Sequence, residues 1–454
     1  MSDVDCIKKP DRFGGLWRNP DFLKLWGGQA VSEIGSRITR EGLPLTAVLV
    51  LGATPSAMGV FAAIQFSAVL LVGIPAGMWV DRIRRRPILI ASDLARAAVL
   101  ATVPWAAAHH ALTMTHLYSV IAMSGILAVF FDVAYQSYLP SLVARDQVLE
   151  GNSKLAMSAA TAEIAGPGIT GVLVQLLTAP IAILFDAMSF LFSAASIASI
   201  RKPEPRPQPQ AHESVRAEAV AGFRFIRAHP VLRPLAYWSV TANFFMSWIA
   251  PLYVLYAIRD LQLGPAALGL AIAFGGAGQF LGAALAPRAT RRFGLGSTFI
   301  LCAVAVAFAI LIIAVAHPPL AFALTALIVQ QIIGDTAFTV FAINEVSLRQ
   351  SVAPQQTLGR ISAAMQMMSR GVWPIGALVG GALAGAIGVR STLALSAVGI
   401  LVSATWLIPL CGAGPLPRAG PPGPALPPAN QTGQGAGCGA GAPPHTNPTS
   451  PAPK

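Results

Sequence analysis

Apolar runs of roughly 20 or more residues recur from Phe22 to Leu410, and they constrain the fold of this chain more than any other feature. Each run can cross about 30 Å of hydrocarbon as an α-helix that rises about 1.5 Å per residue. Only 11% of the 454 residues are charged, whereas soluble chains carry about 25%. We therefore predict an all-α membrane protein with twelve transmembrane helices, at residues 22–51, 56–80, 87–108, 116–139, 153–178, 180–200, 233–258, 263–287, 296–316, 319–346, 358–388 and 391–411.

The composition also divides the chain into segments. Residues 1–21 are a polar cytoplasmic segment, and residues 22–200 and 233–411 each contain six predicted helices. Residues 201–232 begin with a proline-rich stretch, which favours an extended linker, and continue into an amphipathic surface helix. Residues 412–454 are rich in Pro and Gly and nearly uncharged, so we expect a disordered tail that cannot bury enough apolar area to fold.

A weak internal repeat relates the two halves. Alignment of Leu139 with Leu348 gives five identities in eleven positions, and a second alignment places Asp132 opposite Asp335. Secondary transporters are commonly built from duplicated halves. The repeat therefore predicts two pseudo-symmetric six-helix bundles.

The net charge of +12 arises from Lys and Arg residues that lie mainly between the apolar runs. Such residues stay in the cytoplasm because their translocation is unfavourable. With both termini in the cytosol, only Arg259 and Arg390 fall at the outer side, so we predict a multi-pass protein of the cytoplasmic membrane. The bases do not alternate with aromatic residues on one face, which argues against nucleic acid as a partner. The four cysteines, Cys6, Cys302, Cys411 and Cys438, are widely scattered and show no metal-ligand spacing. The sequence also contains no cofactor-binding loop, so we expect neither a metal nor a cofactor.

A charged motif lies between the second and third predicted helices. Gly77 permits close helix approach, and Asp81 can pair with a base or cap a neighbouring helix, which would latch this end of the protein shut. The basic members of the motif are Arg82, Arg85 and Arg86. A degraded copy follows the eighth helix and contains Arg288, Arg291 and Arg292. Each cluster alone is better explained as a basic loop that sets topology, but the matching positions in both halves favour gating.

The first motif resembles the major facilitator superfamily signature Gly-x-x-x-Asp-Arg-x-Gly-Arg-Arg, with Arg84 in place of the second glycine. The fifth predicted helix resembles the Gly-Pro motif of the superfamily's exporters, although an ordinary packing face explains these small residues equally well. The residues concerned are Gly166, Pro167, Gly168 and Gly171. Residues 129–143 and 185–190 resemble the exporter branch that includes macrolide efflux proteins and enterobactin exporters. The resemblance implies the major facilitator fold and transport outward.

Ionisable residues at membrane depth are costly, so each is a functional candidate. Glu33, Arg37 and Glu41 share one face of the first predicted helix, where they can neutralise one another or form a gate or proton site. Asp93 and Arg96 lie near one end of the third helix, where we expect a structural pair.

Three carboxylates are candidates for carrying a coupling proton. Asp186 in the sixth helix has no base nearby in sequence, and burial without a partner favours proton binding. Asp132 in the fourth helix is the second candidate, unless it pairs with the basic loop around Arg85. Glu33 is the third. The remaining intramembrane charges are Asp335 and Arg370.

These features predict a secondary transporter. Our hypothesis is a monomeric, proton-coupled exporter of an amphipathic small molecule, such as an antibiotic or siderophore, that works by alternating access. Aromatic residues such as Phe66, Phe245 and Trp248 are candidates for lining an apolar substrate cavity. The alternatives are an importer of a nutrient or metabolite and a non-transporting membrane sensor. The sequence contains no nucleophile-base pair, metal cluster or phosphate loop, which argues against an enzyme.

Overall fold

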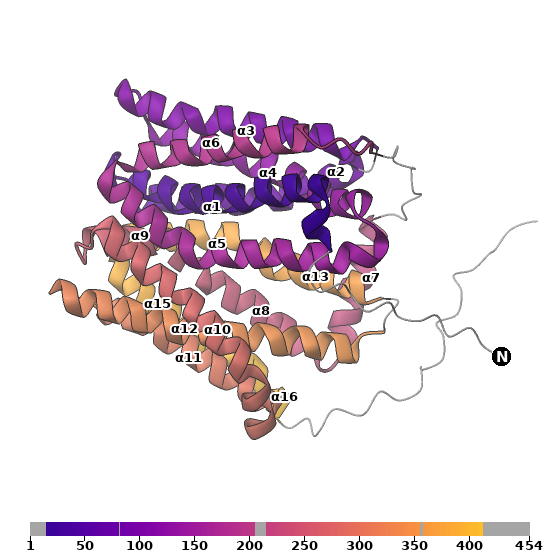
Figure 1. Ribbon diagram of the computed structural model, residues 1–454. Helices are drawn as coiled ribbons and strands as arrows, with labels where there is room; N and C mark the ends of the chain where they lie inside the picture. The colour runs from indigo at the N-terminus through magenta and orange to yellow at the C-terminus, as the bar shows by residue number, and fades with distance from the viewer. Residues whose placement is uncertain (1–14, 81, 205–214, 355–356, 412–454) are drawn as a thin grey trace, which may run out of the picture. The chain divides into compact units, whose positions relative to one another are not determined.

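The computed structural model describes residues 15–80, 82–204, 215–354 and 357–411, and in these ranges all regular elements are helices (Figure 1). The predicted all-α class is therefore confirmed. Asp81, most of the proline-rich stretch and the expected tail from residue 412 lie outside the described residues.

Each of the first six predicted spans is one helix. α1 begins where the Asn19 side chain accepts the N–H groups of Asp21 and Phe22, both at 3.1 Å, and caps the helix. Eleven other described spans are long and apolar enough to cross a membrane. Charged residues make α1 more polar than these spans. It nevertheless packs against α5 and α6. The bounds are α1 (Pro20–Leu49), α2 (Pro55–Val80), α3 (Arg85–Ala108), α4 (Met114–Leu142), α5 (Val148–Leu176) and α6 (Ala179–Ala198).

Three predicted spans of the second half lie where expected, but each is built from more than one helix. The seventh is broken at Ser247–Trp248 and the eleventh at Val372, where Pro374 removes a backbone N–H from the helical pattern. The last continues through a short 3₁₀ turn. The surface helix α7 (Val215–Ala228) was predicted correctly. The other bounds are α8 (Leu232–Met246), α9 (Ile249–Arg259), α10 (Pro265–Phe293), α11 (Leu295–Val315), α12 (Leu320–Val352), α13 (Leu358–Gly371), α14 (Trp373–Ile387), α15 (Val389–Ser403) and α16 (Ile408–Cys411).

Apolar clusters show how α1–α6 and α8–α16 meet. The largest cluster contains buried side chains from both groups of helices, near the connections α1–α2 and α9–α10. At the opposite end, one cluster belongs to the first group and another to the second, together with α7. We call these the joined end and the split end. At the interface, α5 lies beside α10, and α2 lies beside α14.

Candidate functional site

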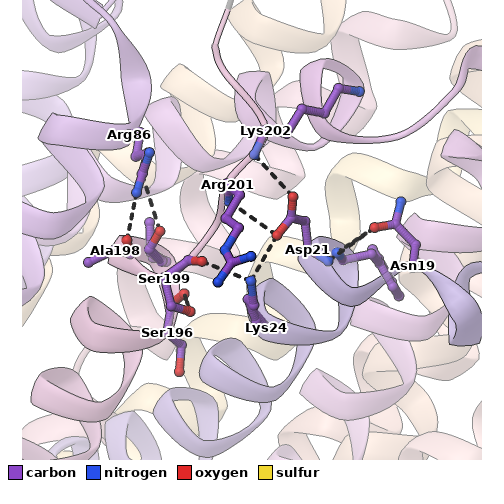
Figure 2. A network of polar contacts seen from close by, with 11 residues as sticks. Asn19, Asp21, Lys24, Arg86, Ser196, Ala198, Ser199, Arg201 and Lys202 are labelled. Carbon is purple, nitrogen blue, oxygen red and sulfur yellow. Dashed lines mark hydrogen bonds and ion pairs between the residues drawn. The ribbon is translucent and has the colours of Figure 1, made fainter.

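The basic motif lies at the split end, and its arginines contact the first half and the start of the linker. The Glu204 carboxylate accepts the backbone N–H groups of Arg85 and Arg86, at 2.6 and 3.0 Å. Arg85 Nη1 also lies 3.8 Å from Glu204 Oε1. The Arg86 guanidinium donates to the carbonyls of Ile197 and Ala198 at the end of α6, at 3.2 and 2.6 Å (Figure 2). These arginines therefore tie α3 to α6 and to the linker.

The latch predicted for this motif rests on Asp81, which lies outside the described residues, so the latch stays a prediction. Arg82 is exposed. The close helix approach expected at Gly77 is absent from the described residues, because a Cβ there would meet no heavy atom within 4 Å. Asp132, whose alternative partner was the basic loop around Arg85, interacts instead with Arg96, and the acidic partner of Arg85 is Glu204. Local sequence could not reveal this partner, since the linker returns to α3 only in the folded chain.

Asp21 fastens the same linker start to α1. Its carboxylate accepts the backbone N–H groups of Arg201 and Lys202, at 3.1 and 3.0 Å, and forms an ion pair of 3.0 Å with Lys24 (Figure 2). Lys24 also donates to the Ser199 carbonyl at 2.8 Å. Two acids thus hold the linker against the split end of the first half.

Replacement of Glu204 with alanine should destabilise the protein by about 0.5–2 kcal/mol, because two N–H groups at the start of α3 lose their acceptor. Thermal unfolding in detergent measures this loss. The matched control is Asp146→Asn, which changes an exposed acid at the same end and should stay within about 0.5 kcal/mol of wild type. Equal losses in both variants would contradict the capping role.

The second basic cluster belongs to the last turns of α10, although the sequence placed it partly in a loop. Its members Arg288, Arg291 and Arg292 are exposed, and Arg288 donates to the Ala284 carbonyl of its own helix at 3.0 Å. None forms an ion pair with another described residue. The gating role predicted for this cluster remains a prediction.

Several charges that the sequence treated separately gather around one buried guanidinium. Arg96 donates to Asp93 Oδ1 at 2.6 Å, so the expected pair is confirmed. Asp132 and Asp186 are both close enough to interact electrostatically with Arg96. Glu33 interacts in the same way with Asp132. We call Asp93, Arg96, Asp132 and Asp186 the Arg96 cluster. All three candidates for proton coupling therefore lie in or beside it.

Asp186 is the most deeply buried of these candidates, at 1% exposure. Its Oδ1 accepts a hydrogen bond of 3.0 Å from Ser189, while its Oδ2 is buried without a partner. Asp186 and Arg96 line the same cavity of about 180 Å³, formed by helices of the first half. A base absent from the nearby sequence is thus supplied by α3.

A second charged group lies on α1 and α5. Arg37 forms an ion pair with Glu163, and Arg40 Nη1 lies 3.4 Å from the same carboxylate. Arg37 also interacts electrostatically with Glu33 and Glu41 of its own helix, so the expected group on α1 gains a further acid from α5. Gly166 makes room for this contact, because a Cβ there would collide with the Arg37 side chain. Sequence reasoning missed Glu163, although its position inside the predicted helix 153–178 marks it as an intramembrane charge.

One carboxylate and one tyrosine of the second half face this group. Asp335 on α12 interacts electrostatically with Glu163, and Tyr253 on α9 interacts with both Asp335 and Glu41. The Tyr253 hydroxyl is buried without a partner. Arg370, in the last turn of α13, is exposed and forms no ion pair with another described residue. We call Arg37, Arg40, Glu41, Glu163 and Asp335 the interface cluster, since it draws on both halves.

Aromatic residues meet at the same boundary. Phe66 on α2 and Trp373 on α14 form an edge-to-face pair with ring centroids 4.6 Å apart. Trp373 Nε1 donates to Asn243 Oδ1 on α8 at 2.8 Å. The interruption of the eleventh span at Val372 therefore places an aromatic side chain between the halves.

Paired glycines bring the halves together at the joined end. A Cβ on Gly381 of α14 would lie 2.7 Å from Gly59 Cα of α2. Gly171 of α5 and Gly269 of α10 meet in the equivalent way, and a Cβ on Gly171 would lie 3.1 Å from Gly269 Cα. Within the predicted Gly-Pro motif, Gly171 makes the contact between halves, whereas a Cβ on Gly168 would meet no heavy atom within 4 Å.

Hydrogen bonds also cross the joined end. Arg259, the last residue of α9, donates from Nη2 to the Gly52 carbonyl after α1 at 2.6 Å. The Ala266 N–H at the start of α10 donates to Gln175 Oε1 on α5 at 3.1 Å. These bonds reinforce the glycine contacts between the halves.

Comparison with known proteins agrees with this architecture. Residues 15–411 match the family model described as an MFS transmembrane secretion effector. The multidrug efflux pump Tap of Mycolicibacterium fortuitum is 29% identical over 342 residues, which cover 72% of this chain and 80% of Tap. The nucleoside transporter NupG superposes with a TM-score of 0.70 at 13% identity, over 87% of this chain and 99% of NupG.

A bacterial homologue of the iron transporter ferroportin has been solved in two states, both 16% identical to this chain. The inward-facing state gives a TM-score of 0.69 and covers 88% of this chain and 100% of the homologue. The outward-facing state gives 0.53, with 86% and 98% coverage. The fold described here is thus more similar to the inward-facing arrangement.

Proposed function

Because the chain belongs to the transmembrane secretion effector family of major facilitator transporters, we propose that this transporter exports amphipathic small molecules by alternating access, coupled to protons. The observation that carries the proposal is the difference between the two ends. The halves share one apolar core at the joined end and have separate cores at the split end. A substrate site between the halves, at the interface cluster, would then face one side of the membrane at a time.

The distribution of basic residues supports a cytoplasmic split end. Arg259 and Arg390 lie at the joined end, whereas the basic motif, the second basic cluster and the linker lie at the split end. Lys and Arg are enriched in cytoplasmic loops. The described state would therefore accept substrate from the cytosol, with both termini inside and the halves comprising residues 22–200 and 233–411.

Export, rather than uptake, is supported by the relative that is named a multidrug efflux pump. The boundary between the halves combines aromatic rings with charged groups, which suits a substrate that has both apolar and polar parts. We propose that the protein acts as a monomer, since each half supplies part of one interface.

The direction and substrate can be tested by expression in a strain that lacks its own pumps, followed by a screen against a panel of antibiotics. Export predicts increased resistance and lower accumulation of at least one compound. Increased accumulation would favour the importer instead, and binding without movement in reconstituted protein would favour the sensor.

Proton coupling is proposed for the group of carboxylates in or beside the Arg96 cluster. The test measures proton release driven by the compound found in the screen, in proteoliposomes that contain Asp186→Asn, Asp132→Asn or Glu33→Gln. At least one variant should lose proton release, with Asp186→Asn expected to show the largest loss. Unchanged coupling in all three variants would rule out these sites.

A further inference from the structure

The cavity beside Asp186 is lined by residues of the first half. Its polar lining includes Thr39 of α1, Gln65 of α2, Arg96 of α3 and Ser124 of α4, in addition to Asp186 of α6. Five helices of one half therefore direct polar groups into the same space. This arrangement requires an occupant that can hydrogen-bond to them.

Three buried polar atoms in this lining have no hydrogen-bond partner: Asp186 Oδ2, Thr39 Oγ1 and Ser124 Oγ. Thr39 lies beside Asp186, yet the two groups do not make a bond of ordinary geometry. Buried polar atoms nearly always have a partner, and water supplies it where the protein does not. The three atoms thus point to a hydrated cavity.

The volume of the cavity indicates whether its occupant is a drug-sized substrate or water. Its volume of about 180 Å³ is below the roughly 300–1,000 Å³ of pockets for drug-sized ligands. At about 30 Å³ for each water molecule, it accommodates roughly six. The cavity therefore suits water better than a drug-sized substrate.

Arg40 connects the cavity with the boundary between the halves. Its side chain lines the cavity and also lies 3.4 Å from Glu163 of the interface cluster. The charged groups that face Asp186 are Arg96 and Asp93 from α3 and Arg40 from α1. Asp132 of α4 interacts electrostatically with Arg96. The neighbouring α2 contributes the uncharged Gln65.

We infer that this cavity holds a chain of water molecules that carries the coupling proton between Asp186 and the boundary between the halves. Release breaks the O–H bond of the Asp186 carboxylic acid and forms an O–H bond on the adjacent water, and the positive charge moves along the chain. The carboxylate that remains lies near Arg96. Thr39 and Ser124 are positioning residues that orient the water. Proton and substrate then occupy different sites in one transporter.

This inference rests on the proposed proton coupling, and a measurement that needs no substrate tests both separately. Time-resolved infrared spectroscopy after a pH jump follows the carboxylic acid band of the full-length protein in liposomes. Subtraction of the Asp186→Asn spectrum assigns the band. In the double variant Thr39→Val/Ser124→Ala, this band should appear at least tenfold more slowly than in the wild type. The double variant Thr39→Ser/Ser124→Thr keeps both hydroxyls and should retain the wild-type rate.

The matched control is Thr46→Val/Ser119→Ala. These hydroxyls lie on the same two helices but bond to the carbonyls of Gly42 and Thr115 in their own helices, so their loss should leave the rate unchanged. A wild-type protein without a titrating Asp186 band would refute the proposed coupling site. If the band appears at the wild-type rate in the double variant Thr39→Val/Ser124→Ala, the water chain is refuted, but the coupling site is not. A response to Na⁺ at constant pH would show a metal cation site instead.

Discussion

Replacement of Gly171 with valine is expected to open the joined end. A side chain at this position would overlap the Pro265 carbonyl and lie 3.0 Å from Ala266 Cα, and backbone atoms cannot rotate away. Overpacking of this kind costs about 1–3 kcal/mol, and each 1.4 kcal/mol changes an equilibrium constant about tenfold. The population of the joined state should therefore fall by roughly five- to a hundredfold.

Distances between spin labels report this change directly. Labels at Thr115 and Leu320, exposed at the joined ends of α4 and α12, should move apart in Gly171→Val. Transport should fall in parallel, since a protein held in one state cannot complete a cycle. Gly168→Val is the matched control, because it adds the same side chain to the same helix in open space. Equal distance distributions in both variants would exclude a role for this contact in closure.

Replacement of Arg96 with alanine is expected to cause the largest loss of stability. Asp93 is fully buried and has Arg96 as its ion-pair partner. The Arg96 guanidinium also lies 4.5 Å from the Phe131 ring centroid and 4.1 Å from that of Phe190. Removal of one member of a buried pair leaves an uncompensated charge and costs about 3–5 kcal/mol. Unfolding in detergent should show this loss, or the protein should fail to accumulate.

A second substitution separates the charge effect from lost packing. Asp93→Asn in the Arg96→Ala background removes the uncompensated charge and should recover part of the stability, whereas independent residues would give additive losses. Arg82→Ala is the control for removal of an exposed arginine, with an expected change within about 0.5 kcal/mol. Additive losses for Asp93 and Arg96 would show that the pair does not account for the effect.

The sequence by itself determined the features that depend on one segment at a time. Hydropathy located the eleven described spans that are apolar throughout, because a helix must remain apolar over the thickness of a bilayer. Helical spacing also identified the pair of Asp93 and Arg96, since residues three apart lie on one face. Even the polar first helix was found, although its charges weaken its apolar signal.

Contacts between distant segments were decided by the tertiary structure. Arg37 forms an ion pair with Glu163 of α5, and Arg85 lies beside Glu204 of the linker. In a membrane, lipid-facing and packed surfaces are both apolar, so hydropathy does not reveal which face of a helix meets its neighbour. The rotation and depth of each helix, set by packing such as the Gly171–Gly269 contact, therefore determine which charges meet. For this reason the sequence supplied the members of the Arg96 cluster, and only the folded chain brought them together around one guanidinium.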